Sequence, residues 1–194
     1  MDKSVFDKQM DFLLEVDKVK EIYRQTYISD VSRFENDAEH SWHSCVMAVV
    51  LSGYFPDADL LKTLKMMLFH DIVEIYAGDT YCYDVEGNKD KEKREKESAE
   101  KIYGLLPEGQ KKEFMDIWME FENGDSPEAK FCRILDRVQP TMLNKASGFA
   151  SWKEHGIKKE QVLERNRTTF EGPEEIKTYM ENIIENAVEN GFLK

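Results

Sequence analysis

Several acidic and histidine side chains of this sequence fall on helix faces that are otherwise apolar. Between residues 60 and 75 leucine, methionine and isoleucine recur at spacings of three and four, which predicts a helix with one apolar stripe. Asp71 belongs to that stripe, because it follows Met67 by four residues. His70 precedes Asp71 directly, and Glu74 follows it by three residues. A carboxylate among apolar side chains is costly to bury unless it is paired, hydrogen-bonded or bound to a cation.

Two other predicted helices carry polar residues in the same way. His40 and His43 lie seven and four residues before Met47, and Asp136 shares a helix face with Cys132. Imidazole and carboxylate together suit Mn, Fe, Co, Ni or Zn, so one divalent ion would compensate all of these side chains.

Each residue alone also fits an ordinary structural role. Asp71 can pair with Arg133 or Arg137, Asp136 can form half of an ion pair, and His40 can be a core histidine. The order of these residues along the chain and the segments around them together favour a bound metal ion over these separate structural roles.

The elements that must position these side chains are predicted to be helical. The expected helices cover about residues 3–22, 38–55, 57–78, 90–105, 107–123, 127–146, 158–169 and 173–190. Residues 79–90 read as a loop and 147–156 as irregular, and no run of alternating β-branched residues predicts a strand. We therefore expect an all-α protein with one domain over residues 1–194. Its core would span about 10–150, with C-terminal helices at about 157–190 packed on it.

Three segments then resemble a known family. The order His40, His70-Asp71 and Asp136 is similar to the H…HD…D signature of the HD-domain metal-dependent phosphohydrolases. Residues 33–43, 69–80 and 129–137 resemble the motif blocks of one subgroup, which holds 5′-nucleotidases and oxetanocin-like proteins. The similarity extends over roughly residues 10–190. It implies an HD-domain helical bundle with a central metal site.

The resemblance also implies the ligands and the chemistry. His40, His70, Asp71 and Asp136 would bind one divalent ion, either Mn, Co, Fe, Ni, Zn or Mg, which activates a water molecule for attack on a phosphate. Glu74 is expected to act as general acid or base. Asp79 would assist proton transfer or hold the ribose, and His43 is expected beside the ligands rather than among them.

Substrate contacts are assigned in the same way. Arg24 matches the position of a phosphate-binding arginine in nucleotidase relatives, and Arg33 is a second candidate. Trp42 is a candidate platform for the base. Some deoxynucleotidases have tryptophan after this arginine, whereas this sequence has Gln25, which leaves the choice between ribose and deoxyribose open.

Composition limits the partners. The 194 residues include 39 acidic and 27 basic side chains, giving a formal net charge of −12, which disfavours nucleic acids and anionic membranes. No apolar run is long enough to span a bilayer, and the N-terminus has no secretory pattern. The three cysteines form no CxxC pair, so we expect reduced thiols and a cytoplasmic location.

The predicted function is metal-dependent hydrolysis of nucleoside 5′-monophosphates to nucleoside and phosphate, with a small-molecule nucleotide as partner. An HD phosphohydrolase acting on a cyclic nucleotide, guanosine tetraphosphate or a deoxynucleoside triphosphate is the alternative within the enzyme class. A non-catalytic protein that binds a metal and a nucleotide is the alternative outside it. A homodimer is compatible with the enzymatic functions and with the non-catalytic one.

Overall fold

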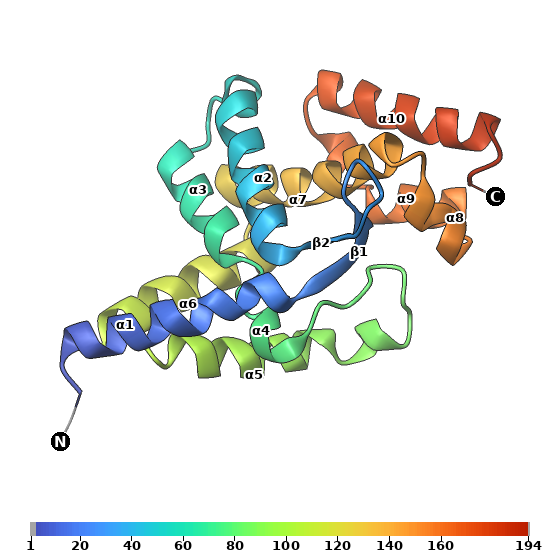
Figure 1. Cartoon of the computed structure of the whole chain (residues 1–194). Helices are drawn as coiled ribbons and strands as arrows, with labels where there is room; N and C mark the ends of the chain where they lie inside the picture. The colour runs from blue at the N-terminus through green and yellow to red at the C-terminus, as the bar shows by residue number, and fades with distance from the viewer. Residues whose placement is uncertain (1–2, 194) are drawn as a thin grey trace.

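The chain folds into helices with one small β-hairpin, as Figure 1 shows. The structure is a computed structural model that describes residues 3–193, so Met1, Asp2 and Lys194 of the expected domain lie outside the description. The all-α prediction is confirmed apart from the hairpin. None of the helices in the described part of the chain is long and apolar enough to cross a membrane.

Three helices carry most of the candidate site and pack on one another. They are α2 (Asp37–Leu51), α3 (Leu60–Phe69) and α7 (Pro127–Ala146). The remaining helices are α1 (Val5–Val16), α4 (Glu74–Ala77), α5 (Lys91–Tyr103), α6 (Glu108–Asn123), α8 (Ala150–His155), α9 (Lys159–Arg165) and α10 (Glu174–Glu189). The strands are β1 (Tyr23–Tyr27) and β2 (Phe34–Asn36).

Local capping fixes where the three central helices begin. The Asn36 side chain accepts a hydrogen bond from the Glu39 amide at the start of α2, and the Glu39 carboxylate accepts from the Asn36 amide in return. The Asp59 side chain accepts from the Lys62 amide at the start of α3, and Ser126 followed by Pro127 starts α7 at the predicted residue. The sequence therefore sets the register of the helices that carry the site.

The C-terminal helix shares its core with the central helices. Ile176 and Met180 of α10 belong to the same buried cluster as Met47 of α2 and Phe131 of α7. The Phe131 ring is stacked on Phe55 with a centroid separation of 3.8 Å. This cluster packs the C-terminal helix α10 on α2 and α7.

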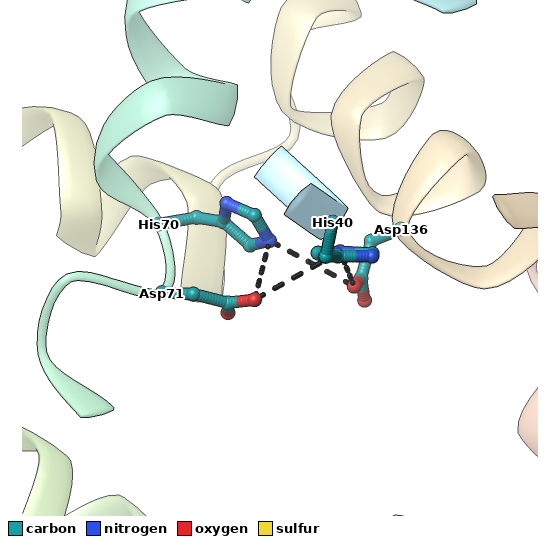
Figure 2. Close-up of side chains that lie close together, drawn as sticks. All are labelled: His40, His70, Asp71 and Asp136. Carbon is teal, nitrogen blue, oxygen red and sulfur yellow. Dashed lines mark ion pairs between the residues drawn. The ribbon is translucent and has the colours of Figure 1, made fainter. Parts of the chain in front are cut away.

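The predicted continuous helix over residues 57–78 is wrong, because the helix stops at Phe69 and restarts at Glu74. Two side chains of α5 contact backbone carbonyl groups on either side of this break. The Tyr103 hydroxyl donates to the Phe69 carbonyl at 2.8 Å, and the Ser98 hydroxyl donates to the Val73 carbonyl. The break places His70 and Asp71 on a bend, where their side chains turn toward α2 and α7 (Figure 2).

The hairpin is the second difference from the prediction. Tyr23 pairs with Asn36 and Tyr27 with Phe34 in an antiparallel register with an irregularity between them. The pairing is stabilised by stacking of Tyr27 on Phe34, with ring centroids 4.3 Å apart. Helix α1 ends at Val16 and a 3₁₀ helix continues it over Asp17–Glu21, so the first predicted helix is helical nearly to its expected end. The hairpin that follows brings Arg24 toward the site.

Smaller differences occur near the C-terminus. The stretch expected to be irregular contains α8, which starts after Phe149 in a left-handed conformation, at φ 63°. Helix α9 ends at Arg165, before the predicted residue 169.

Candidate metal centre and cavity

The structure brings His40, His70, Asp71 and Asp136 together, and Figure 2 shows their side chains converging. One potential ligand atom from each of the four lies within 4.8 Å of all the others. His40 Nε2 is 3.2 Å from Asp136 Oδ1, and His70 Nε2 is 3.1 Å from Asp71 Oδ2. The side chains come from α2, the bend after α3, and α7, so three separate segments build the cluster.

Both histidines present an unused ring nitrogen to the two carboxylates. His40 Nδ1 lies 2.9 Å from Gln139 Oε1, and His70 Nδ1 lies 2.9 Å from the Met67 carbonyl oxygen. Because these oxygens only accept, each ring carries a proton on Nδ1. The two Nε2 atoms are buried and have no hydrogen-bond partner among residues 3–193. Two such nitrogens beside two carboxylate oxygens fit a divalent metal ion.

The charge of the cluster supports the same interpretation. Burial lowers the pKa of His70, but Asp71 and Asp136 outweigh it and raise that pKa to about 10. Without a metal ion, a proton therefore takes the place on Nε2 that the ion would occupy.

A buried hydrogen-bond network orients the His40 ring through its Nδ1 atom. Gln139 accepts from His40 with its oxygen and donates with its nitrogen to Glu35 at 2.6 Å. The same nitrogen lies 3.2 Å from His43 Nδ1, so His43 contacts Gln139, which in turn orients the candidate ligand. This agrees with the expectation that His43 lies beside the ligands. The sequence pattern does not single out Gln139, although its position three residues after Asp136 places both on one side of the same helix.

Arg24 lies against the carboxylates of the site. Its Nη1 donates to Asp71 Oδ2 at 2.8 Å and to Asp37 Oδ1 at 3.2 Å. The alternative pairing of Asp71 with Arg133 or Arg137 is therefore not what the structure has. Arg24 instead neutralises the acidic side of the site.

Glu74 and Asp79 also reach this region. Glu74 is 3% exposed, and its carboxylate lies within 4.8 Å of ligand atoms on Asp37 and Asp71. Burial and these two carboxylates hold the pKa of Glu74 well above its ordinary value. Asp79 lines the same cavity directly after Gly78, whose φ of 76° turns the chain at the end of α4. Burial raises the pKa of Asp79.

Arg33 and Trp42 are placed elsewhere, contrary to the expectation that they contact the substrate. Neither is among the described residues that line the cavity. Arg33 forms an ion pair with Glu39 at the start of α2, and Trp42 is 66% exposed on the outer face of that helix. Trp42 points away from the inward face of α2, because it follows the inward-facing His40 by two residues on that helix.

Among the described residues, the cavity is lined by four further cations that the sequence did not predict as substrate contacts: Lys91, Arg133, Arg137 and Arg165. Arg133 and Arg137 enter the sequence prediction only as alternative partners of Asp71. Lys91 and Arg165 come from α5 and α9, and no local pattern connects them with the ligands. Only the tertiary packing brings them to the site.

Comparison with known proteins agrees with this geometry. The family model described as HD domain matches residues 16–177. The human protein named 5′-deoxynucleotidase HDDC2 is 32% identical over 141 residues, which cover 72% of this chain and 67% of the relative. A 5′-deoxynucleotidase of Saccharomyces cerevisiae is 28% identical, over 66% of this chain and 55% of its own length.

Solved structures give the same result. A protein of Magnetospirillum magnetotacticum described as a predicted metal-dependent phosphohydrolase superposes with a TM-score of 0.93 at 39% identity. That match covers 98% of this chain and 96% of the other. An HD-domain phosphohydrolase of Listeria innocua shares the fold, with a TM-score of 0.63 at 16% identity over 93% of this chain and 86% of the other. The resemblance seen in the sequence is thus confirmed, and the chain belongs to the HD-domain family.

Proposed function

We propose that this chain is a metal-dependent phosphohydrolase that converts nucleoside 5′-monophosphates, with 2′-deoxynucleotides as the preferred class, to nucleoside and phosphate. The observation that carries the proposal is the pair of buried Nε2 atoms that face Asp71 and Asp136 at a cavity and have no hydrogen-bond partner within residues 3–193. The relatives named 5′-deoxynucleotidases support the substrate class.

His40, His70, Asp71 and Asp136 would hold the divalent ion in this proposal. When bound, the ion polarises the phosphoryl group and lowers the pKa of water. Gln139 and the Met67 carbonyl fix the two imidazole rings so that their Nε2 atoms face the cluster. Arg24 balances the excess negative charge of Asp37 and Asp71.

Glu74 would handle the proton in this mechanism. Burial and the neighbouring carboxylates raise the pKa of its carboxyl group well above the ordinary value, which favours the protonated form that can give a proton to the departing nucleoside oxygen. Asp79 lies in the same cavity with Gln25, and we assign the sugar hydroxyls to these two side chains. Some deoxynucleotidases have tryptophan at the position of Gln25, so the preference for ribose or deoxyribose has to be measured.

We further propose a homodimer that buries the outer face of α2. Trp42, Val46, Val49 and Val50 form an exposed apolar row there, with Leu61 of the adjacent α3 also exposed. An apolar row of this length on a folded surface is typical of an interface. Light scattering should give the mass of two chains, and Val50→Asp should give the mass of one. A wild-type mass of one chain would contradict the dimer.

A cytoplasmic location is part of the same proposal, supported by Cys45, Cys82 and Cys132, which are all free thiols in the described structure.

Phosphate release from a panel of ribo- and deoxyribonucleoside 5′-monophosphates, with Mn²⁺, Co²⁺ or Mg²⁺, tests the function. Chromatography of the products separates phosphate from pyrophosphate or triphosphate, and so separates this function from cleavage of cyclic nucleotides, guanosine tetraphosphate or triphosphates. Tight nucleotide binding without turnover under any metal would favour a non-catalytic role.

A further inference from the structure

The wall of the cavity formed by α7 and α9 carries an excess of positive charge. Arg133, Arg137 and Arg165 all line the cavity there. Arg133 is committed to the protein, because it donates to the carbonyl groups of Phe121 and Gly124 at 2.7 Å each. The guanidinium groups of Arg137 and Arg165 therefore determine which ligands this wall of the cavity can bind.

Two donor atoms of Arg137 have no acceptor in the described part of the chain. They are the Nε and Nη1 atoms, and both are buried. Buried donors without acceptors cost free energy, and a bound anion would remove that cost.

Arg165 connects this wall with the ligand cluster. Its Nη2 lies 3.5 Å from Asp136 Oδ2, while Asp136 Oδ1 faces His40 Nε2 at 3.2 Å. One carboxylate therefore touches both the candidate metal site and Arg165. An anion bound at the cluster would lie next to this guanidinium group, whose side chain is still 38% exposed and free to make a further contact.

Arg24 is less suited to this task than the sequence predicts. Its Nη1 already donates to two carboxylates, and its Nε lies 4.0 Å from Glu35. Its charge is thus balanced by carboxylates of the protein, whereas Arg137 forms no ion pair with any residue that the structure describes.

We propose that Arg137 and Arg165 bind the phosphate group of the substrate, with Arg165 next to the metal ligands and Arg137 as the second guanidinium donor. The planar fork of donors on each arginine matches the oxygens of a phosphate. This inference rests on the proposed function, since it names the side chains that would recognise the phosphate in that reaction.

The test compares phosphate with a ligand that lacks it. Inhibition by inorganic phosphate and by a deoxynucleoside is measured on the metal-loaded protein, for wild type, Arg165→Ala, Arg165→Lys and Arg137→Ala. The loss of one charge-assisted contact should weaken phosphate inhibition, and raise KM for the monophosphate, by about 10- to 100-fold. Inhibition by the deoxynucleoside should stay within about twofold, and Arg165→Lys should recover part of the loss.

Arg167→Ala is the matched control, because Arg167 is 73% exposed in its side chain and pairs only with Glu164 in the described structure, at 3.9 Å. It should leave every value unchanged. The metal content of each variant is measured, because Arg165 contacts a candidate ligand.

Unchanged phosphate inhibition in both alanine variants, with metal retained, would overturn the inference. Equal losses for phosphate and deoxynucleoside would also overturn it, since they indicate a purely structural role. If the wild type hydrolyses no monophosphate, calorimetric titration of the same variants with inorganic phosphate still tests the arginines separately from the proposed function.

Discussion

Glu74 owes its proposed role to its surroundings rather than to its residue type. A glutamate at the surface would be ionised at neutral pH and would have no proton to donate. Glu74 is buried beside Asp37 and Asp71, which together hold the pKa of its carboxyl group well above the ordinary range. The acid needed for the leaving group therefore comes from local electrostatics.

Replacing Glu74 tests this assignment. Glu74→Gln keeps the size of the side chain but removes the proton, so kcat should fall by about 100- to 10,000-fold while the metal content stays at the wild-type level. Glu97→Gln is the control, because Glu97 is 69% exposed in its side chain on α5. A Glu74→Gln protein with wild-type kcat would exclude Glu74 as the acid or base.

His70 predicts a link between metal binding and pH. The metal-free protein carries a proton on this imidazole up to about pH 10, because Asp71 and Asp136 overcome the effect of burial on its pKa. The ion must displace that proton, so below this pH the metal dissociation constant should rise about tenfold for each pH unit of acidification. Calorimetry in two buffers of different ionisation enthalpy should detect about one proton released per ion near neutral pH. Metal affinity independent of pH would contradict the prediction.

Gln139 is expected to act through His40. Gln139→Leu removes the acceptor that holds the His40 ring, and should weaken metal binding by about 10- to 100-fold without removing a ligand. His43→Ala should have a smaller effect, because His43 contacts Gln139 and not the cluster. Titration of the metal-free variants with Co²⁺ measures both, and equal effects would show that the order of contacts is not the one described.

The break between α3 and α4 is the element-scale feature on which the site depends. It turns His70 and Asp71 toward α2 and α7, and it is held by hydroxyl groups of α5. In a continuous helix, residues 70–74 would stay on the helix cylinder. Their side chains would then point away from the helix axis in successive directions.

Tyr103→Phe tests the break by removing one hydroxyl with almost no change of shape. The Phe69 carbonyl loses its donor, so the free energy of unfolding should drop by about 1 to 3 kcal/mol, and metal affinity should drop with it. Tyr54→Phe, at a tyrosine that is 45% exposed, should change neither. Urea denaturation and Co²⁺ titration give the two values. Loss of stability with full metal affinity would mean that the bend does not depend on this contact.

Elements with local signals were predictable from the sequence, and those made by tertiary contacts were not. Ser126 and Pro127 predicted the start of α7, and the three motif blocks predicted the four candidate ligands. The bend after Phe69 depends on Tyr103, which is 34 residues away, so the apolar spacing predicted an unbroken helix. In the same way, Arg165 reaches Asp136 only through packing of α9 near α7.

At the scale of the whole molecule, the distribution of charge reconciles an acidic protein with a phosphate substrate. Residues 107–128 and 171–194 carry nine of the twelve net negative charges and none of the predicted site residues. Fields from exposed charges are screened over about 8 Å at physiological salt, so the local cations decide binding in the cavity. The arginines at α7 and α9 supply that local charge.

The shared core predicts that residues 1–194 unfold as one domain. Phe131 is 1% exposed in the cluster that joins α2, α7 and α10, so Phe131→Ala should lower the free energy of unfolding by about 3 to 5 kcal/mol. The variant should still unfold in one transition, with far-ultraviolet circular dichroism and tryptophan fluorescence coinciding. Two separated transitions would mean that the C-terminal helices form a unit of their own.

The most direct test of the account is phosphate release from 2′-deoxynucleoside 5′-monophosphates by the Co²⁺-loaded protein, compared with Asp71→Ala treated identically. We predict rapid release of inorganic phosphate by the wild type and almost none by the variant, because Asp71 belongs to the four-residue cluster that would hold the ion. No release by the wild type with any divalent metal, or equal release by both proteins, would contradict the central claim.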